Sequence, residues 1–431
     1  MIKIPKLPWV IAGLLFFSTL INYTARLTLS VVAGNVLREF SLTERDYAQI
    51  VSLFLAAYAV MYAGSGWVVD RLGTRRGFGL FVSAWSATQV FTGFVLGKWS
   101  LAACQFGLGL AEPGNFPAGV KTVHEWFPPH QRAAAVGLFN AGSSLGAALG
   151  APVAAFLTVR YGWRSAFFFT GALGFVWLAF WLVICPQPGS ARWRAARHEN
   201  GLEDSWIAPG GTDAVTSKPD PLRLLRSRPC YTLILARFLT DPVVYFILFW
   251  LPRYLEKGRG FDIAMVGKYA WVPFFFGGSG YLFGGWLSGR LMRAGWSLPR
   301  ARKAAMLAGA CFMPSAMFAP RVSSAGLAIC AVSFVVFGHA IWVSNLLTLP
   351  ADLFNPDEVG TGSGFSGMGG AISGIIATLC TGYVVTRFSY QPIFLLAGLM
   401  HPLAMALVFW LLPDRDFPKA RITRARIIPE G

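Results

Sequence analysis

The chain is poor in charged residues, and above all in acidic ones. Only 13% of its 431 residues are charged, whereas a soluble protein of this size carries about 25%. Asp and Glu number 20 against 37 Lys and Arg, which gives a net charge of +17. Together with a hydrophobic content of 55%, this composition excludes an ordinary soluble domain.

Cysteine and histidine are also scarce. The six cysteines fall inside or at the ends of apolar runs, and their spacing fits neither a metal site nor a disulfide framework. The five histidines show no close metal-ligand spacing, and no nucleophile–base pair is visible inside an apolar run. We therefore expect no metal, no cofactor and no enzymatic activity.

Long apolar runs are what the chain has in abundance. A run of about 20 residues crosses the ~30 Å hydrocarbon core of a bilayer as a helix. The twelve runs cover approximately residues 9–33, 47–68, 78–97, 99–121, 134–158, 165–185, 230–252, 267–288, 303–319, 324–346, 360–383 and 391–412. The sequence thus predicts an all-α membrane protein with twelve transmembrane helices.

The basic residues are unevenly distributed between the loops. If the N-terminus is cytoplasmic, most Lys and Arg fall in cytoplasmic segments, as the positive-inside rule requires. This bias predicts that both termini are cytoplasmic. It also explains the net charge without a nucleic-acid partner, so the expected partners are the lipid bilayer and a small ligand.

One long polar stretch divides the apolar runs into two groups of six. Residues 186–229 are rich in Pro, Gly, Ser and Arg and have no helical apolar period, so we expect a partly disordered cytoplasmic linker. The predicted domains are an N-terminal six-helix bundle over 1–185, the linker, a C-terminal six-helix bundle over 230–413 and a basic cytoplasmic tail over 414–431.

The two groups resemble each other in sequence. The motif Gly66-x3-Asp70-Arg71-x-Gly73-x-Arg75-Arg76 follows the second run, and Gly285-x3-Gly289-Arg290 follows the eighth. Likewise Trp126-Phe127-Pro128-Pro129 precedes the fifth run, and Leu353-Phe354-Asn355-Pro356 precedes the eleventh. A six-plus-six repeat is typical of transporters that rock two bundles about a site at the membrane midplane.

We call the six residues Gly66, Asp70, Arg71, Gly73, Arg75 and Arg76 the gate motif. Asp70 and the arginines lie at a short cytoplasmic turn, where interhelix ion pairs and helix-end contacts can hold one face shut. Positive-inside anchoring alone explains the arginines but not the spacing of the glycines and the aspartate. The pattern therefore favours a cytoplasmic gate, and it resembles the signature between helices 2 and 3 of the major facilitator superfamily.

Further segments narrow this resemblance. They are Asn22-Tyr23-x-x-Arg26, Leu110-Ala111-Glu112-x-Gly114-Asn115-Phe116-Pro117, Phe238-Leu239-Thr240-Asp241-Pro242, Phe249-Trp250-Leu251-Pro252 and His339-x-x-Trp342-x-x-Asn345. Together they resemble the anion:cation symporter family, and within it the hexuronate transporters. The resemblance implies proton-coupled uptake of sugar acids or related organic anions by a protein of the bacterial inner membrane.

Arg26 is a cation in the middle of the first apolar run. A charged side chain at membrane depth costs ~2.5–3.5 kcal/mol or more, so it faces a polar cavity or a partner. No acidic residue lies near it in the sequence, so we expect a cation available to an anionic ligand. Asn22 and Tyr23 share its broad helix face and are further candidates for substrate contact. The alternative is an arginine held by backbone carbonyls.

Three other ionisable residues complete the charged set inside the runs. Glu112 lies in a run interrupted by Pro113 and Pro117, and a carboxyl at membrane depth suits a proton-coupling site. The alternative is a neutral, hydrogen-bonded structural acid. Arg237 and Asp241 are four residues apart, so an intrahelical ion pair is expected, with either a structural or a gating and binding role. Pro242 is predicted to break or kink that helix.

Aromatic and amide side chains complete the predicted substrate site. The candidates are Tyr58, Tyr62, Asn140, Ser143, Trp342 and Asn345, and matching positions of the family favour Tyr58, Asn140, Trp342 and Asn345 among them. Aromatic residues in such helices are more often packing residues than ligands, and that alternative stays open for each of them.

The chain departs from the family pattern at four positions. Tyr62 replaces the usual Gln, Gly289 replaces the acidic residue of the second gate motif, and two further departures remove charges inside the runs. The family commonly has Asp before the arginine of the first helix and Arg seven residues before the glutamate of the fourth, where this chain has Ala25 and Gln105. Because the two missing charges have opposite sign, we infer a compensated double loss of one ion pair. Proton coupling then depends on Glu112.

These observations predict a secondary active transporter that imports an organic monocarboxylate, such as a hexuronate-like sugar acid, by alternating access. H⁺ is the expected coupling ion, and we expect a monomer. The alternatives are an uncoupled anion facilitator and a transporter-like anion receptor that does not transport.

Overall fold

A computed structural model of the protein describes residues 7–200, 202, 220–261, 265, 269 and 271–417. The predicted tail beyond residue 417 and residues 203–219 of the predicted linker lie outside this range. The described residues form helices joined by short turns, with no β-strand among them.

Six long helical segments form the first half of the chain. They are α1 (Leu7–Glu39), α2 (Glu44–Leu72), α3 (Thr74–Thr92), α4 (Lys98–Ala111) continued by the 3₁₀ turn η1 (Glu112–Gly114) and α5 (Asn115–Trp126), α6 (Pro129–Tyr161) and α7 (Trp163–Ile184). Each overlaps one predicted span. The fourth is bent because Pro113, which has no backbone N–H, lies in the 3₁₀ turn between α4 and α5.

The second half repeats this arrangement. Its segments are α10 (Arg228–Arg253), α12 (Val272–Arg293), α13 (Leu298–Phe312) with η4 (Met313–Phe318), α14 (Ala325–Leu346), α16 (Val359–Arg387) and α17 (Gln391–Leu411). The π-helical turn η3 (Tyr254–Gly258), the short helix α15 (Leu349–Leu353) and the 3₁₀ turn η5 (Asp414–Asp416) join or end them. The protein is thus an all-α membrane protein built as two six-helix bundles.

Eight of these helices in the described residues are long and apolar enough to span a membrane by length and composition alone. The others are α3, the bent α4–α5 segment, α12 and α13 with η4. α13 is short, and its first turns carry the basic residues Arg300, Arg302 and Lys303. α4, α5 and α13 are each too short by themselves because 3₁₀ turns divide their spans, and the many glycines of α12 lower its hydropathy.

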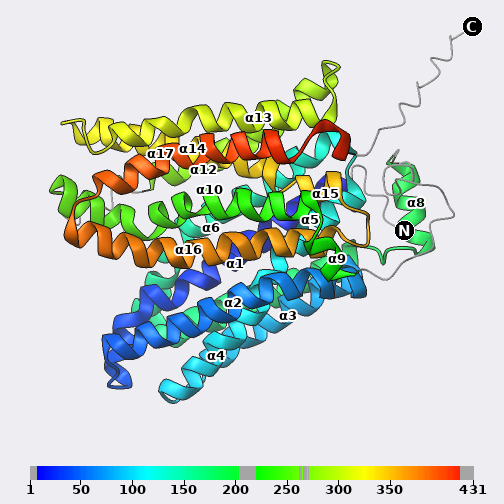
Figure 1. Cartoon of the computed structure of the whole chain (residues 1–431). Coiled ribbons are helices and arrows are strands. Elements are labelled where there is room, and N and C mark those ends of the chain that lie inside the picture. Colours follow the sequence, from blue (N-terminus) through cyan, green and yellow to red (C-terminus); the bar gives the residue numbers. More distant parts are fainter. Residues whose placement is uncertain are drawn as a thin grey trace, which may run out of the picture.

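The predicted linker contains two short helices. They are α8 (Ala191–Glu199) and α9 (Pro221–Leu225). Arg197 of α8 is buried and donates a hydrogen bond to the backbone carbonyl of Glu125 in α5. We call the end of the molecule that carries α8 and α9 the linker face, and the opposite end the far face (Figure 1).

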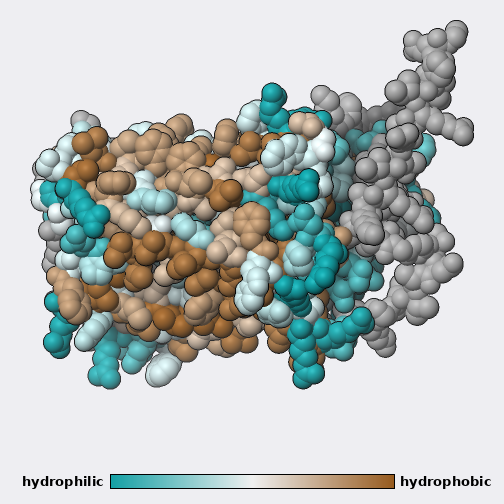
Figure 2. Space-filling model, turned by 45° about the horizontal axis from the view of Figure 1, so that its top comes forward, coloured by the Kyte–Doolittle hydropathy of each residue, from teal (hydrophilic) through white to brown (hydrophobic). Residues whose placement is uncertain are grey.

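The two bundles lie close together at the linker face and diverge toward the far face. In Figure 1, α2 approaches α16 near α9, and the lower helices α1, α2 and α4 turn away from α16 at the other end. A broad apolar band covers the middle of the surface in Figure 2, with more hydrophilic residues toward both ends. This is the surface of a protein embedded in a bilayer.

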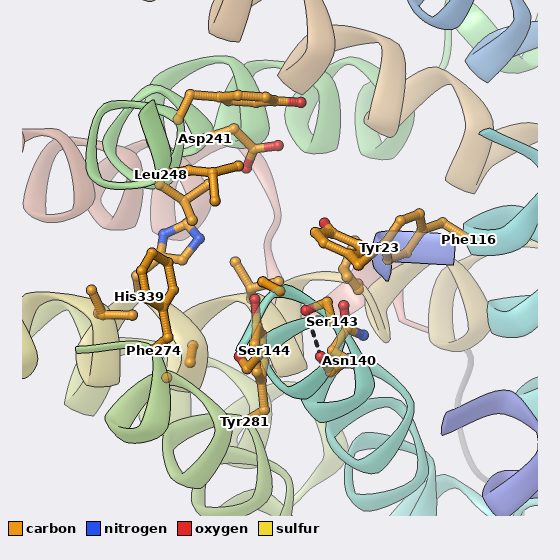
Figure 3. Close-up of a pocket in the computed structure, with 18 of the residues that line it drawn as sticks. Tyr23, Phe116, Asn140, Ser143, Ser144, Asp241, Leu248, Phe274, Tyr281 and His339 are labelled. Atoms are coloured by element: carbon orange, nitrogen blue, oxygen red, sulfur yellow. Dashed lines mark hydrogen bonds between the residues drawn. The ribbon is translucent and has the colours of Figure 1, made fainter. Parts of the chain in front are cut away.

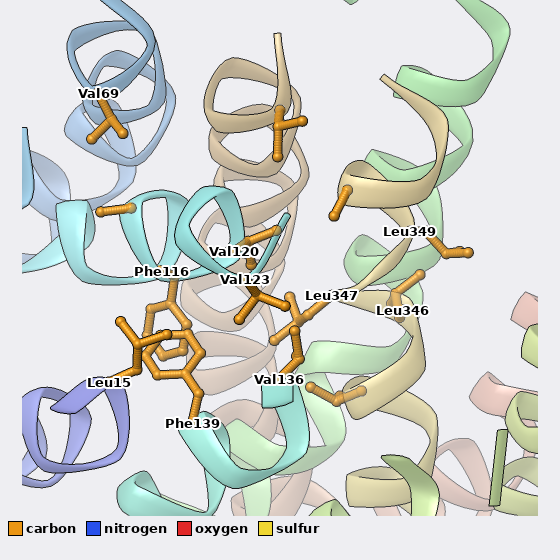
Figure 4. Packing of buried hydrophobic residues seen from close by; sticks show 14 of the residues in the cluster. Leu15, Val69, Phe116, Val120, Val123, Val136, Phe139, Leu346, Leu347 and Leu349 are labelled. Atoms are coloured by element: carbon orange, nitrogen blue, oxygen red, sulfur yellow. The ribbon is translucent and has the colours of Figure 1, made fainter. Parts of the chain in front are cut away.

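One apolar cluster includes buried residues of both halves. Phe116 of α5 and Phe139 of α6 have ring centroids 5.6 Å apart, and Val136 of α6 lies in the same cluster as Leu347, which follows α14 (Figure 4). This packing joins the halves beside the charged residues described below.

Candidate functional site

A cavity of about 110 Å³ lies between the two halves at mid-depth. Its lining comes from α1, α2, α5 and α6 of the first half and from α10, α12 and α14 of the second (Figure 3). The polar residues in the wall are Tyr23, Arg26, Tyr58, Tyr62, Asn140, Ser143, Ser144, Arg237, Asp241, Tyr245, Tyr281 and His339. The cavity therefore has polar walls at the depth where the chain is otherwise most apolar.

Arg26 lies in this wall, and it has an acidic partner. Its Nε donates a 2.8 Å hydrogen bond to Oε2 of Glu112, 86 residues away in the chain. The expectation that no carboxylate neutralises Arg26 was wrong, because the bend of the fourth span brings η1 against α1. The guanidinium also lies between the rings of Tyr23 and Tyr58, at 4.9 and 4.6 Å from their centroids, contacts that stabilise a cation.

Glu112 is fully buried and uses only one of its two oxygens. Oε2 accepts from Arg26, whereas Oε1 has no hydrogen-bond partner. A buried, half-satisfied carboxylate depends strongly on its single cation. A second anion that competes for Arg26 would leave Glu112 with an uncompensated charge.

Asn22 lies behind Arg26 rather than in the cavity wall. It is fully buried, and its Oδ1 accepts from Nη2 of Arg26 at 3.4 Å, while its Nδ2 has no partner. The structure therefore gives Asn22 the role of orienting the arginine, not of touching a ligand in the cavity.

The second half contributes its own ion pair to the wall. Nη2 and Nε of Arg237 donate to Oδ2 of Asp241 at 2.6 and 2.9 Å, as the spacing of four residues predicts. The phenol of Tyr62 accepts from Arg237 at 3.5 Å across the interface between the halves.

The predicted break at Pro242 is absent, since α10 runs without interruption from Arg228 to Arg253. One missing backbone hydrogen bond is tolerated in a packed membrane helix.

Two tyrosines link the charged groups of the two halves. The rings of Tyr58 and Tyr62 meet edge to face at 5.4 Å. Tyr58 contacts Arg26 of the first half, and Tyr62 contacts Arg237 of the second. The site is thus a single polar surface assembled from both bundles.

Some of the residues predicted from the sequence to bind the substrate do not line the cavity. Asn140 lines it, although its Nδ2 is occupied by the carbonyl of Val136 at 2.9 Å. Trp342 and Asn345 do not line it: both are fully buried in α14. Asn345 donates to the carbonyls of Gly284 and Ile341, which ties α14 to α12. Both residues pack between helices in this structure, and their contact with a substrate stays a prediction.

Sequence reasoning missed four polar wall residues. They are Ser144, Tyr245, Tyr281 and His339. His339 carried a usable signal, because an ionisable residue inside an apolar run is rare, but the histidines were considered only as metal ligands. The serine and the two tyrosines gave no such signal, since small and aromatic residues are common in packed membrane helices.

The gate motif lies at the linker face, where the two halves touch. Asp70 accepts hydrogen bonds from the backbone N–H groups of Gly360 and Thr361, at 3.0 and 2.6 Å, and from the Thr361 hydroxyl. These donors form the N-terminus of α16, which favours a negative charge. Lys121 of α5 completes the contact at 2.7 Å, so the ion-pair partner of Asp70 is a lysine and not an arginine of the motif.

The other gate-motif residues fit the helix ends around Asp70. Gly66 faces Gly360 so closely that a Cβ would collide with its carbonyl. Gly73 has φ of +76°, a conformation that favours glycine, and it joins α2 to α3. Arg75 donates to the carbonyl of Leu182 at 2.6 Å. Of the two flanking arginines, Arg71 stacks on Trp67, and Arg76 lies in the first turn of α3.

A second buried ion-pair network closes the same face. Asp352 of α15 accepts from Arg302 at 2.8 Å within its own half and from Arg132 of α6 at 3.1 Å in the other half. Arg132 also donates to the backbone carbonyl of Ala351. The sequence gave no indication of this network, because Arg132 and Asp352 are 220 residues apart.

At the far side of the cavity lies a larger, mainly apolar chamber of about 630 Å³ between α2, α10 and α16. Tyr58 and Tyr245 line both spaces. A charged cavity between two six-helix bundles, with contacts between the bundles at the linker face, is typical of transporters that work by alternating access.

Comparison with known proteins gives the family. The Major Facilitator Superfamily model matches residues 15–378 and 337–429. The chain is 31% identical over 416 residues to the hexuronate transporter of Escherichia coli (strain K12), covering 95% of this chain and 94% of that protein. It is 27% identical over 390 residues to the D-galactonate transporter of Escherichia coli O6:H1, covering 88% and 89%.

The fold is similar to that of a solved proton:xylose symporter of the same superfamily bound to 6-bromo-6-deoxy-D-glucose, with a TM-score of 0.76 at 14% identity. That likeness covers 94% of this chain and 96% of the symporter. The chain belongs to the major facilitator superfamily, and it is a multi-pass membrane transporter rather than an enzyme.

Proposed function

We propose that the protein imports a hexuronate-like sugar acid across the bacterial inner membrane in symport with protons. Arg26 binds the carboxylate of the substrate, and Glu112 exchanges the coupling proton. The observation that carries this proposal is the single 2.8 Å contact between Arg26 Nε and Glu112 Oε2 in the cavity wall.

The coupling follows from competition for one guanidinium. Arginine's planar fork binds a carboxylate bidentately, but here Glu112 already occupies Nε. When the substrate carboxylate takes that place, Glu112 loses its only cation at a buried position, so it must bind a proton. Release of the substrate reverses the exchange, and the proton leaves as the ion pair forms again.

The relatives support the choice of substrate class. The hexuronate and D-galactonate transporters are named for six-carbon sugar acids, each with a single carboxylate and several hydroxyl groups. Besides the cations, the cavity wall offers phenols, hydroxyls and an amide, including Tyr23, Asn140 and Ser143. Such groups recognise sugar hydroxyls by hydrogen bonds.

The distribution of basic residues supports the orientation. The linker face carries the gate motif, α8 and the basic first turns of α13, and we assign it to the cytoplasm by the positive-inside rule. The chamber at the far side then faces the outside. This conformation, in which the linker face is closed, corresponds to a carrier that can bind substrate from the outside.

Purified protein in liposomes tests this proposal. An inward proton gradient is expected to drive accumulation of labelled D-galacturonate or D-glucuronate in the wild type. Glu112→Gln is expected to abolish gradient-driven accumulation but to keep exchange of labelled for unlabelled substrate, since the neutral amide mimics the protonated carboxyl. The matched control is Glu199→Gln, at an exposed glutamate of α8, which should behave like the wild type.

Three results would contradict parts of the proposal. Uptake that ignores collapse of the proton gradient would indicate an uncoupled facilitator. Binding without exchange across the liposome membrane would indicate a receptor. No binding of any sugar acid would refute the substrate class.

A further inference from the structure

A second buried titratable group lies in the C-terminal half, beside the cavity. His339 of α14 and His401 of α17 are hydrogen-bonded through Nδ1 and Nε2 at 3.0 Å. Their ring centroids are 5.2 Å apart, and the rings are nearly perpendicular, at 78°. His401 is completely buried, whereas His339 lines the cavity, opposite the tyrosine and asparagine of the first half (Figure 3). This histidine pair is the only His–His hydrogen bond in the described residues.

The surroundings of the pair are mainly apolar. The charged groups of α10 that share the cavity wall with His339 are Asp241 and Arg237. Tyr281 of α12 shares the cavity wall with His339. The described segments α13 and η4 bring no ionisable side chain to the pair, and the Nδ1 atom of His401 has no hydrogen-bond partner. Because Asp241 is already bound by Arg237, no free carboxylate neutralises a positive charge on the histidines.

This environment makes the charge of the pair dependent on the cavity. Two neutral imidazoles share one hydrogen in their bond, and one additional proton converts them into an imidazolium that donates to a neutral imidazole. In the empty cavity that positive charge would be buried without compensation. When the substrate carboxylate replaces Glu112 at Arg26, the negative charge moves into the cavity that His339 lines, so the proton and the anion stabilise each other's binding.

We propose that the His339–His401 pair is a second proton-binding site, which is filled when an anionic substrate occupies the cavity. The proton comes from water in the cavity and adds to a ring nitrogen of His339, whose Nδ1–H then donates to Nε2 of His401. No other bond is formed or broken. This inference rests on the proposed symport, and it places one proton site in each half of the transporter.

The two sites respond to the substrate for different reasons. Glu112 takes a proton because the substrate removes its cation, whereas the histidine pair takes one because the negative charge of the substrate lies in the cavity that His339 lines. The transporter would thus carry two protons with each monocarboxylate.

Nuclear magnetic resonance of ¹⁵N-histidine tests the site in the full-length protein. The chain has five histidines, and His339→Gln and His401→Gln assign the signals of the pair. At pH 6.5 without ligand, both rings are expected to be neutral. With saturating D-galacturonate, one proton is expected to appear on the pair. Rings that stay neutral while calorimetry detects bound D-galacturonate would overturn this proposal and leave the proposed function intact.

Proton counting in liposomes provides the second measurement. A trapped pH dye and labelled D-galacturonate are expected to give two protons per substrate for the wild type and one for His339→Gln. The control is His198→Gln, at an exposed histidine of α8, which should keep two. An unchanged proton count in His339→Gln would also overturn the proposal, and a wild type that binds no sugar acid would refute both this proposal and the function on which it rests.

Discussion

Three kinds of group contact the guanidinium of Arg26: a carboxylate, an amide oxygen and aromatic rings. Glu112 accepts its Nε–H, the Asn22 amide oxygen accepts from Nη2, and two tyrosine rings cover its faces. This arrangement fixes the plane of the fork while leaving Nη1 without a hydrogen-bond partner among the described residues. An incoming carboxylate thus meets a pre-oriented cation, which reduces the entropy cost of binding.

A lysine at this position keeps the charge but loses the fork. We expect Arg26→Lys to weaken binding of D-galacturonate by roughly 10- to 100-fold, because bidentate geometry and stacking are lost. Calorimetry on purified protein measures this change. Arg71→Lys is the matched control, since Arg71 stacks on Trp67 at the linker face, away from the cavity. Equal affinities for the wild type and Arg26→Lys would show that Arg26 does not bind the carboxylate.

The sequence identified the charged residues of the site but not their partners. Arg26, Glu112, Arg237 and Asp241 stand out because charge is costly at membrane depth. The pair at 237 and 241 was predictable, since four residues make one helical turn. The contact between Arg26 and Glu112 was not, because it depends on how η1 is placed against α1, 86 residues away.

The segment of α4, η1 and α5 carries two buried acids, one at its bend and one near its end. Glu112 occupies the bend, and Glu125 lies near the end of α5 at the linker face, beyond the predicted span. The hydroxyl of Thr74 in α3 donates to Oε2 of Glu125 at 2.7 Å. Burial raises the pKa of Glu125 from 4.5 to about 7, despite the nearby Lys121.

This raised pKa predicts a pH dependence of stability. Between about pH 4.5 and 7 the folded protein binds more protons at Glu125 than the unfolded chain does, so stability falls as the pH rises through this range. The full effect is on the order of 3 kcal/mol. We expect Glu125→Gln to remove this pH dependence. The Tm of the variant minus the Tm of the wild type should therefore rise by a few degrees between pH 5 and pH 7.5.

Melting of the protein in detergent, followed by intrinsic fluorescence, measures the effect. Glu199→Gln, at an exposed position of α8, should follow the wild type at every pH. A Tm difference between the wild type and Glu125→Gln that does not vary with pH would show that Glu125 titrates normally.

Helix boundaries show what sequence patterns alone leave open. Apolar runs located all six helices of each half, because hydrocarbon thickness fixes their length. The predicted start of this helix, residue 267, lies outside the described residues, and α12 is described from Val272 to Arg293. Its linker-face end extends beyond the apolar run because Arg290 and Arg293 in its last turn favour a helix C-terminus.

For the molecule as a whole, the sequence repeat predicted the two bundles, but not which end is closed. Closure depends on contacts between residues far apart in the chain, such as Asp70 with Thr361 and Arg132 with Asp352. These contacts exist in one conformation of an alternating-access cycle. Because the same sequence adopts each conformation of that cycle, the sequence alone does not predict which end is closed in this structure.

The closed linker face makes Asp70 a determinant of the conformational equilibrium. We expect Asp70→Asn to weaken the contact with the N-terminus of α16 and to shift molecules toward the state open at the linker face, by about tenfold for a loss of ~1.4 kcal/mol. The reporter is Ser52→Cys, an exposed position that lines the far chamber. Its labelling by a bulky thiol reagent should slow in the Asp70→Asn background.

The experiment requires a protein in which the six native cysteines are replaced. Asp357→Asn is the matched control, because Asp357 is an exposed acid near the same face, and it should leave labelling unchanged. Labelling of Ser52→Cys that is equally fast with Asp70→Asn would show that Asp70 does not hold the linker face shut.

The paired charges of the cavity wall have an electrical consequence. In the described residues of the wall, Arg26 is matched by Glu112 and Arg237 by Asp241, so the empty site has no net charge. Moving one elementary charge through a membrane potential of 100 mV changes the free energy by about 2.3 kcal/mol. In the proposed cycle we therefore expect the empty transporter to return to its starting state without sensing the voltage, so that the membrane potential acts on the loaded step.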